Sequence, residues 1–226
     1  MSRSAAPKAN AEAPLREAIP LRTGAGSTRV AILAFDEVEA LDLAGPYEVF
    51  TTASRMRGRE EPTAPPRFDV ACVARSASAV RMRAGLSILP SHTFDDAPRA
   101  DLLIVPGGVV DGPLACAATL DWIARTSREA AITASVCTGA FLLAAAGIVE
   151  SGPVTTHWED IAELRGRFPS LEVREGVRWV DQGPVMTSAG ITAGIDMSLH
   201  LVARLAGHAL AERTARQMDF AWTPNA

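Results

Sequence analysis

Ala131-Ile-Thr-Ala-Ser-Val-Cys-Thr-Gly-Ala140 is the stretch that decides the fold of this 226-residue chain. Its first six residues, Ala131 to Val136, are small or apolar and predict a strand buried on both faces of a sheet. A helix is predicted directly afterwards, over Thr138 to Ala146. Cys137 lies between the two elements, so we expect its thiol on a tight turn from strand to helix.

The alternation of strands and helices continues on both sides of this stretch. Further strands are predicted over Arg29–Phe35, Phe68–Ala74, Leu102–Val105, Arg178–Val180 and Val185–Thr187, with a small hairpin over Val80–Leu89. Further helices are predicted over Leu41–Ser54, Leu120–Ala130, Glu159–Phe168, Ala193–Ala206 and Leu210–Met218, and an exposed loop over Arg55–Pro66. This order predicts an α/β fold, a three-layer sandwich with a mostly parallel sheet. Ligands of such sheets bind at the carboxyl ends of the strands.

Composition and charge narrow the class of protein. Hydrophobic residues make up 48% of the chain and its formal net charge is −4, which fits a globular protein and provides no general basic field for nucleic acid. No apolar run reaches the length of a membrane span. The three cysteines are too few for a disulfide framework, and no spacing of His and Cys predicts a metal site.

The first 28 residues differ from the rest of the chain. They are rich in Ala, Pro, Ser and charge, and they lack the apolar stretch of a signal peptide. We therefore predict a disordered N-terminal extension over residues 1–28 and one folded domain over residues 29–226 of a cytoplasmic protein. A transit peptide is disfavoured because Glu12 and Glu17 break the acid-poor composition of such segments.

Cys137 is the strongest candidate for a catalytic residue. A nucleophile on a strand-to-helix turn is presented to solvent while its backbone is strained, and the positive end of the following helix favours a thiolate. We therefore expect a covalent nucleophile with a pKa below that of a free thiol, although a buried structural Cys is the commoner fate of free thiols. Cys72 lies within an apolar strand and is expected in the core. Cys116 has no charged neighbour in sequence and is expected to be structural.

Asp42 follows the first predicted strand and is therefore expected at the same edge of the sheet as Cys137. A carboxyl group there can hydrogen bond to the thiol or activate water. The alternative is that Asp42 caps the N-terminus of its own helix. Glu37 and Glu39 are nearby competitors for an acid role.

Pro106-Gly107-Gly108 ends the strand that precedes the Cys137 strand. Glycines at this point allow the backbone to approach a substrate closely. We expect the N–H groups of Gly108 and Thr138 to form an oxyanion hole, with Gly107 beside them.

Two segments later in the chain have open roles. His157 is expected to pair with Cys137, to line the pocket, or to be a hydrogen-bonded structural His. The run Gly190-Ile-Thr-Ala-Gly194 leads into a helix, and we expect Ile191 and Thr192 to complete a pocket wall rather than only to cap that helix. Asp196, His200 and Arg204 recur at steps of four and predict a solvated polar stripe on the helix.

Six motifs occur together in a specific order. They are Leu41-Asp-Leu-Ala-Gly-Pro-Tyr-Glu-Val-Phe50, Ile104-Val-Pro-Gly-Gly108, Ser135-Val-Cys-Thr-Gly139, Ala145-Ala-Gly147, Thr155-Thr-His-Trp158 and Ile191-Thr-Ala-Gly-Ile-Asp196. Together they resemble the ThiJ/PfpI (DJ) superfamily, and within it the isonitrile hydratase branch. The resemblance covers about Arg29 to Pro224. It implies a flavodoxin-like sheet related to the class I glutamine amidotransferases, a homodimer, and no metal or organic cofactor.

The resemblance also implies a reaction. The family's essential Cys corresponds to Cys137, its neighbouring Thr to Thr138 and its acid to Asp42. In isonitrile hydratases the Cys attacks the terminal carbon of a small-molecule isonitrile, a thioimidate forms, and water releases an N-substituted formamide. An acid beside the thiol is useful because the carbon accepts a nucleophile only when the isonitrile is protonated. The residues after Gly108 and the loop Arg55–Pro66 depart from that branch, and both are expected to border the pocket.

Two alternatives remain on this framework. The first is a glyoxalase- or deglycase-like enzyme that uses the same nucleophile, whereas a peptidase is disfavoured because Thr138 stands where that branch has a His. The second is a non-catalytic ligand-sensing domain, similar to those of AraC-type regulators. The short segment after Ala206 is expected to pack on the domain rather than to form a DNA-binding unit.

Overall fold

Short segments rich in Val, Ile, Leu and Ala form a seven-stranded sheet at the centre of the molecule. The computed structural model describes residues 26–224. The sheet consists of β1 (Thr28–Leu33), β2 (Phe68–Ala74), β5 (His92–Thr93), β6 (Leu102–Val105), β7 (Ile132–Val136), β10 (Trp179–Asp181) and β11 (Val185–Ser188). Their order in space is β10-β11-β7-β6-β1-β2-β5. All neighbours are parallel except β10, which is antiparallel to β11.

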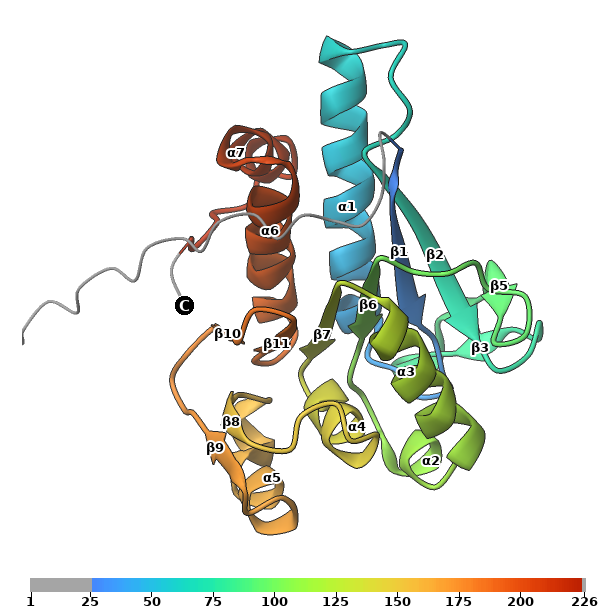
Figure 1. The fold of residues 1–226 in the computed structure, drawn as a ribbon, viewed down its shortest axis with the longest axis vertical. Helices are drawn as coiled ribbons and strands as arrows, with labels where there is room; N and C mark the ends of the chain where they lie inside the picture. The colour runs from blue at the N-terminus through green and yellow to red at the C-terminus, as the bar shows by residue number, and fades with distance from the viewer. Residues whose placement is uncertain (1–25, 225–226) are drawn as a thin grey trace, which may run out of the picture.

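Helices cover both faces of the sheet (Figure 1). One face carries α1 (Ala40–Glu60), α6 (Ala193–Ala206) and α7 (His208–Gln217), and the other carries α2 (Asp111–Leu114), α3 (Ala117–Glu129) and α4 (Gly139–Ala145). The 3₁₀ turn η2 (Trp158–Asp160) and α5 (Ile161–Arg167) lie beside a two-stranded sheet of β8 (Gly152–Val154) and β9 (Leu171–Val173). A hairpin of β3 (Val80–Arg81) and β4 (Ser87–Ile88) contains the 3₁₀ turn η1 (Arg83–Gly85). The predicted α/β three-layer sandwich is confirmed.

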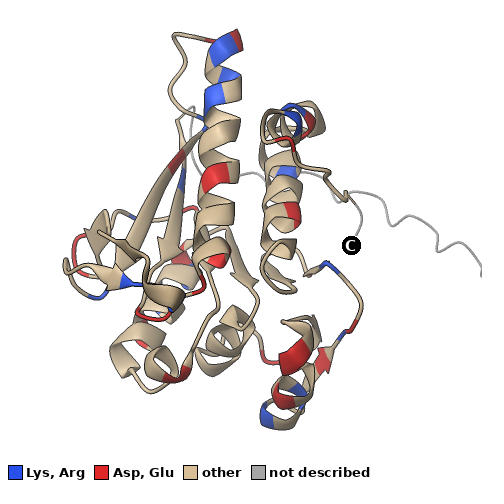
Figure 2. Cartoon of the chain, turned by 180° about the vertical axis from the view of Figure 1, so that it is seen from behind, with Lys and Arg blue, Asp and Glu red and all other residues tan. Residues whose placement is uncertain are grey.

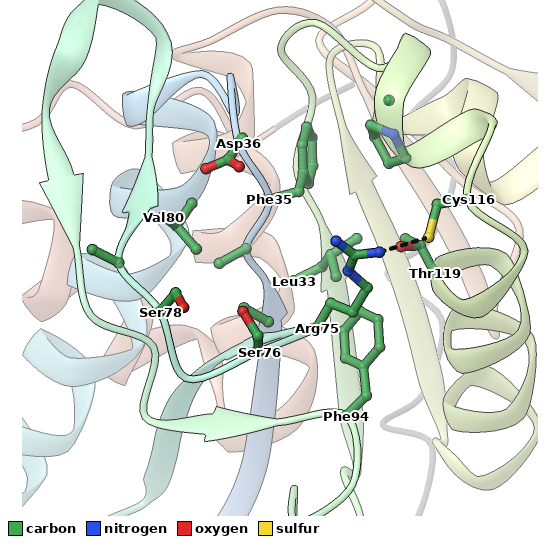
Figure 3. A pocket seen from close by; sticks show the side chains of 15 residues that line it. Leu33, Phe35, Asp36, Arg75, Ser76, Ser78, Val80, Phe94, Cys116 and Thr119 are labelled. Atoms are coloured by element: carbon green, nitrogen blue, oxygen red, sulfur yellow. Dashed lines mark hydrogen bonds between the residues drawn. The ribbon is translucent and has the colours of Figure 1, made fainter.

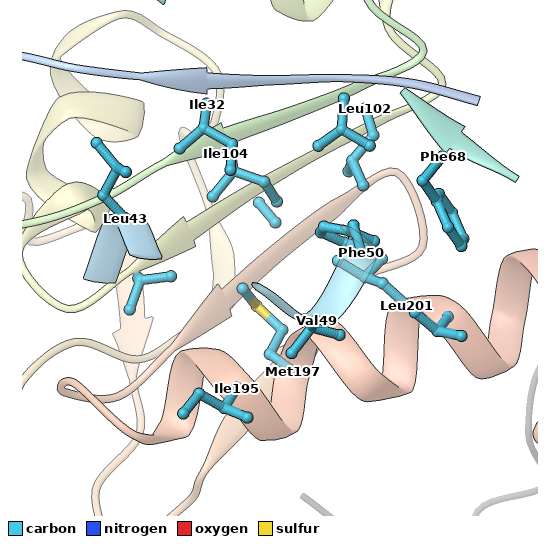
Figure 4. Packing of buried hydrophobic residues seen from close by; sticks show 14 of the residues in the cluster. Ile32, Leu43, Val49, Phe50, Phe68, Leu102, Ile104, Ile195, Met197 and Leu201 are labelled. Carbon is cyan, nitrogen blue, oxygen red and sulfur yellow. The ribbon is translucent and has the colours of Figure 1, made fainter. Parts of the chain in front are cut away.

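Two hydrophobic clusters separate the layers, because alternate side chains of each strand point to opposite faces. Ile32 of β1 packs with Phe50 of α1 and Met197 of α6, as Figure 4 shows. The next residue, Leu33, belongs to the second cluster with Phe141 of α4. The central strands are therefore buried on both faces, which explains why they are continuous apolar runs in the sequence.

The predicted loop over Arg55–Pro66 is wrong in its first half. Helix α1 continues through Glu60, where Arg57 bonds to Glu61 and Arg213 of α7 bonds to Glu60. Figure 2 shows the Arg residues that gather at this end of the helix. The end lies away from the carboxyl edge of the sheet (Figure 1), so the segment does not border the site as expected.

Strand β1 begins at Thr28, which pairs with Phe68 and is buried. The predicted N-terminal extension falls mainly on residues 1–25, which lie outside the described residues. Over residues 26–224, no helix combines the length and the apolar character that crossing a membrane requires. In the same part of the chain, no three His, Cys, Asp or Glu side chains cluster as a metal site would require.

Candidate active site

Cys137 occupies the turn between β7 and α4 in a left-handed backbone conformation, with φ of 57°. This conformation is unfavourable for a residue with a Cβ, by about 1–2 kcal/mol, and hydrogen bonds hold it in place. The Cys137 N–H donates to the carbonyls of Ser188 and Ala189 at 3.1 and 3.2 Å. The Thr156 hydroxyl donates to the Cys137 carbonyl at 2.9 Å. The strained elbow predicted from the sequence is therefore present and is held from two sides.

Asp42 lies in the first turn of α1 and its side chain is fully buried. Its Oδ2 accepts the Gly107 N–H at 3.1 Å. Glu39 occupies the N-cap position, so the alternative that Asp42 caps its helix is wrong. Glu37 is exposed and the Glu39 carboxylate lies 3.9 Å from Arg83, which leaves Asp42 as the buried acid.

Burial raises the pKa of Asp42 to about 7, against the lowering effect of hydrogen bonds from Gly107, Cys137 and Ile191. Its Oδ1 has no partner at ordinary hydrogen-bond geometry among the described residues. An orphaned buried oxygen of this kind favours the protonated form of the acid. Asp42 can therefore hold or release a proton near neutral pH beside Cys137.

The pKa of Cys137 differs from the expectation. Burial, and then the negative charge of Asp42, raise the pKa of its thiol to about 12, although the Thr138 N–H lowers it. The prediction of a pKa below that of a free thiol is wrong, because lost hydration and a facing carboxylate outweigh the N-terminus of the seven-residue helix α4. At neutral pH the proton stays on sulfur until an acceptor takes it.

The glycines after β6 serve mainly to bring Asp42 and Thr138 together. A Cβ at position 107 would lie 2.5 Å from Thr138 N and 2.9 Å from Asp42 Oδ2, so only glycine fits there. The Gly108 N–H donates to Thr138 Oγ1 at 2.9 Å, and the same hydroxyl donates back to the Gly108 carbonyl. The predicted oxyanion hole therefore lacks its Gly108 donor. The Thr138 N–H is the donor that faces the thiol.

A cavity of about 810 Å³ lies beside the elbow. His157, Ile191 and Thr192 line it, together with Thr155, Thr156, Trp158, Glu159, Ile161, Ala162, Arg165, Glu175, Gly176, Val177, Arg178, Ala189 and Gly190. The segment Gly190–Thr192 thus forms a cavity wall, as its position before α6 predicts. The cavity combines apolar surface with threonine hydroxyls and charged groups at its rim, which suits a small organic ligand.

His157 lines this cavity, but its ring nitrogen Nδ1 contacts acidic side chains rather than Cys137. Its Nδ1 lies 3.4 Å from Asp160 Oδ2 and 3.7 Å from Glu159 Oε2. The ring also fills the space that a Cβ at Gly190 would need, at 2.1 Å from Cδ2. Of the three expected roles, the geometry favours the pocket wall over a pair with Cys137.

The expected solvated stripe of Asp196, His200 and Arg204 is wrong. All three are buried. Asp181 of β10 accepts from Arg204 at 3.0 Å and lies 3.1 Å from His200 Nε2. Asp196 Oδ2 accepts from Arg178 Nε at 2.8 Å. Helical spacing alone gave no sign of these partners, because they come from the segment around β10.

A second, smaller cavity of about 280 Å³ lies at the ends of β1 and β2, beside Cys116 (Figure 3). Cys116 is half-buried at the N-cap of α3. Hydrogen bonds from the Thr119 side chain and N–H, and the charge of Arg75, lower the pKa of the Cys116 thiol. The charged neighbour that the sequence around Cys116 does not show is therefore Arg75, whereas Cys72 is buried in β2 as expected.

The comparisons with known proteins agree with this geometry. Residues 28–204 match the DJ-1/PfpI family. An isonitrile hydratase of Pseudomonas putida is 35% identical over 199 residues, which are 87% of this chain and 80% of that protein. The transcriptional regulator GbdR of Pseudomonas aeruginosa is 29% identical over 80% of this chain, a region that makes up 47% of the regulator.

Solved structures give the same result for the fold. A ThiJ/PfpI family protein from Pseudomonas syringae superposes with a TM-score of 0.75 at 30% identity, covering 96% of this chain and 84% of the other. Its sheet and helices thus follow the same path as those around Cys137. The flavodoxin-like architecture implied by the sequence motifs is confirmed.

Proposed function

The chain belongs to the DJ-1/PfpI family, and from that membership we propose that it is an isonitrile hydratase-like lyase. In this proposal Cys137 is the covalent nucleophile and Asp42 the proton carrier. The observation that carries the proposal is the buried pair itself, in which a strained thiol faces an acid with a pKa of about 7. The 35% identity to an isonitrile hydratase supports the choice of substrate.

The first step suits an acid–thiol pair because an isonitrile takes up both sulfur and a proton at one carbon. The proton of the Cys137 thiol passes through Asp42 to the terminal carbon of R–N≡C. The sulfur forms a bond to the same carbon and gives the thioimidate R–N=CH–S–Cys. Since the thiol keeps its proton at neutral pH, transfer to Asp42 accompanies attack rather than preceding it.

Hydrolysis of the thioimidate completes the cycle. A water molecule attacks the thioimidate carbon through its oxygen, and Asp42 accepts a proton from that water. Asp42 passes this proton to the nitrogen, which gives the tetrahedral adduct R–NH–CH(OH)–S–Cys. The C–S bond then breaks as the proton of the new hydroxyl group passes through Asp42 to the sulfur. The products are R–NH–CHO and the free Cys137 thiol, so the balance is one isonitrile plus one water to one formamide.

The cavity beside the elbow would receive the R group. Trp158, Ile161 and Ile191 provide apolar surface there, and the Thr156 hydroxyl is bonded to the Cys137 carbonyl. A hydrophobic R group of moderate size fits a cavity of about 810 Å³.

Formamide production from cyclohexyl isocyanide tests the proposal. We expect turnover by the wild type and none by Cys137→Ala. The variant Cys116→Ala, which removes the half-buried thiol at the second cavity, should turn over like the wild type. An unchanged rate in Cys137→Ala, or no formamide from the wild type, would contradict it. In the second case the same three proteins are assayed with methylglyoxal, which detects a glyoxalase- or deglycase-like activity of the same thiol.

A ligand-sensing domain is the second candidate, because regulators such as GbdR share 29% identity over 80% of this chain. A sensor binds without turnover. Calorimetric binding of a small molecule that both wild type and Cys137→Ala retain, with no product formed, would support this second function over the first.

A further inference from the structure

The cavity beside Cys116 is separate from the cavity beside the elbow. It is lined by Leu33 and Ala74, the last residues of β1 and β2, whereas the larger cavity is lined by the residues that follow β11. The two cavities share no lining residue. Ligands of parallel sheets bind at this edge, so a reactive group in the smaller cavity stands where a small molecule can reach it.

The backbone of Cys116 is fixed as the N-cap of α3. Its carbonyl accepts the N–H groups of Thr119 and Leu120 at 3.0 and 3.2 Å. Its thiol is half-buried and lines the cavity, as Figure 3 shows. The positive end of a 13-residue helix therefore lies behind the sulfur, where it favours the thiolate.

Two hydrogen-bond donors flank this sulfur. Arg75 follows β2, and its Nη1 lies 4.0 Å from Cys116 Sγ. Thr119 is only 5% exposed, and its hydroxyl lies beside the sulfur in Figure 3. A guanidinium carries five N–H donors in a planar fork, so one N–H can contact sulfur while another binds an oxygen atom. A thiol, a cation and a buried hydroxyl thus meet in one small space.

The rest of the lining limits what can enter. Phe35 and Phe94 form apolar walls, and the other charged residue of the lining is Asp36. Asp36 lies across the cavity from Cys116 in Figure 3, and its Oδ1 accepts the Arg81 N–H at 2.9 Å. The sulfur therefore faces a cation rather than a carboxylate. A volume of about 280 Å³ lies below the usual range for drug-sized ligands, so the cavity suits a reactant of few atoms.

We propose that Cys116 is a site of oxidation by a small hydroperoxide, whose oxygens Arg75 and Thr119 bind. The thiolate sulfur attacks the terminal oxygen of R–O–OH. An S–O bond forms, the O–O bond breaks, and its electron pair leaves on RO⁻, which takes up a proton in place of the one that the thiol released. The balance is Cys–SH plus ROOH to Cys–SOH plus ROH, with sulfur oxidised by two electrons and the peroxide reduced.

This assignment follows from where charge develops in the step. Negative charge passes from sulfur to the leaving oxygen, and a guanidinium and a hydroxyl aimed at that space stabilise it there. The lowered pKa of the Cys116 thiol supplies the attacking thiolate. The site uses no residue of the acid–thiol pair, so it is independent of the proposed function.

Hydrogen peroxide is the probe that tests the proposal on the full chain. Dimedone traps sulfenic acid as it forms, and peptide mapping by mass spectrometry measures the adduct at each cysteine. Cys116 should be oxidised faster than Cys72 and Cys137, because burial is the first cause that raises the pKa of those thiols, to about 11 and about 12. Sulfenic acid that forms at Cys116 no faster than at Cys72 would overturn the proposal.

Arg75→Gln separates peroxide binding from thiolate formation. Alkylation by iodoacetamide depends on the thiolate but offers no peroxide oxygen, and at low ionic strength it should slow by about two- to threefold. Oxidation by hydrogen peroxide should slow by about tenfold or more, since a charge-assisted hydrogen bond to the leaving oxygen is also lost. Arg75→Lys keeps the charge but not the fork of donors, so oxidation should fall more than alkylation there as well.

Equal slowing of the two reactions in Arg75→Gln would overturn the proposal, because Arg75 would then act on the thiolate alone. Thr119→Val keeps the β-branched shape and removes the hydroxyl, and it should show the same excess loss of oxidation. Arg128→Gln is the matched control, since Arg128 is exposed in the last turn of α3 and both rates should stay unchanged. Arg75 is exposed as well, so its variants test the site even if Thr119→Val does not fold. No isonitrile enters these assays, so their outcome is separate from that of the hydratase test.

Discussion

Cys137 and Cys116 both lie just before the N-terminus of a helix at the carboxyl edge of the sheet, Cys137 after strand β7 and Cys116 after the short helix α2, yet their surroundings act on the thiols in opposite ways. Cys137 is buried and faces Asp42, and the pKa of its thiol is raised to about 12. Cys116 is half-buried, and Thr119 and Arg75 lower the pKa of its thiol. The comparison teaches that what covers the sulfur, rather than the helix behind it, decides its charge.

The difference also separates two kinds of chemistry. A protonated thiol beside a buried acid suits a reaction that delivers sulfur and a proton to the same atom. A thiol stabilised as thiolate and open to solvent suits direct reaction with an electrophile. Asp42 is therefore the residue whose change should disturb the first site most.

Asp42→Asn is expected to lower formamide production by about 10²–10⁴-fold, because the proton carrier is lost. The same change removes the negative charge that raises the pKa of Cys137. Alkylation of Cys137 at pH 7 should therefore become faster while turnover falls. Steady-state rates and the rate of Cys137 labelling, measured on the same variant, check both effects.

The matched control is Glu39→Gln, which removes the other carboxylate on α1 that bears on Asp42. Its turnover should change only slightly, because Glu39 is paired with Arg83 and is not part of the pair. Equal losses in Asp42→Asn and Glu39→Gln, or slower labelling of Cys137 in Asp42→Asn, would contradict the assignment.

Asp42 should also lower the stability of the fold as pH rises. The carboxyl ionises near 3.8 when unfolded and near 7 when folded, because burial disfavours its charge. The free energy of unfolding therefore falls between about pH 4 and pH 7, by up to about 4 kcal/mol, and stays lower above that range. Below pH 4 both states are protonated and the effect is absent.

Denaturant unfolding of wild type and Asp42→Asn at pH 4 and pH 8 measures this effect. Asn cannot ionise and retains an oxygen for the Gly107 N–H. The variant should be the more stable protein at pH 8, and the advantage should shrink at pH 4. The same difference at both pH values would show that Asp42 is not held protonated by burial.

Much of the fold could be predicted because apolar periodicity reports burial directly. Phe68–Ala74, Leu102–Val105 and Ala193–Ala206 have the predicted bounds. The end of α1 at Glu60 could not be placed, since its last turn is held by Arg213 of α7, which is 153 residues away in sequence. Tertiary contacts of that kind leave no local signal.

The sequence could predict which residues form the site, but it could not predict the pKa values of those residues. The rule that strand ends meet at one edge brings Asp42, Gly107 and Cys137 together correctly. It says nothing about the pKa of a thiol, which depends on how deeply the sulfur is buried. The rule also misses Arg178, whose only local signal was its position at the start of a short strand. Its partner Asp196 has the sequence spacing of a solvated helix face, so the ion pair between the two could not be predicted.

Partial alkylation tests the contrast between the two thiols directly. At pH 7, with limiting iodoacetamide, Cys116 should react about 30-fold faster than Cys137 or more. The pKa of Cys137 is about 12 and that of Cys116 lies below 9.0, so the thiolate populations differ by more than about 10³. The less basic thiolate of Cys116 is also the weaker nucleophile, which reduces its advantage in rate by roughly 30-fold.

Peptide mapping by mass spectrometry measures this ratio, with Cys72 as an internal reference. Burial raises the pKa of Cys72 to about 11, so it should label slowly as well. Faster labelling of Cys137 than of Cys116 in the folded wild type would reverse the comparison and restore the lowered pKa expected from the sequence.

Arg75→Gln should produce the smallest effect. The Arg75 guanidinium lies 4.0 Å from Cys116 Sγ and is exposed, so water and salt screen its charge. The hydrogen bonds from Thr119 come first among the causes of the lowered pKa and remain in the variant. Labelling of Cys116 should slow by about two- to threefold at low ionic strength, and the difference should disappear in 1 M salt.

The control is Arg128→Gln, which changes an exposed residue in the last turn of α3 and should leave the labelling rate of Cys116 unchanged. A loss in Arg75→Gln that persists in 1 M salt would mean that Arg75 shapes the cavity in Figure 3 rather than attracting the thiolate.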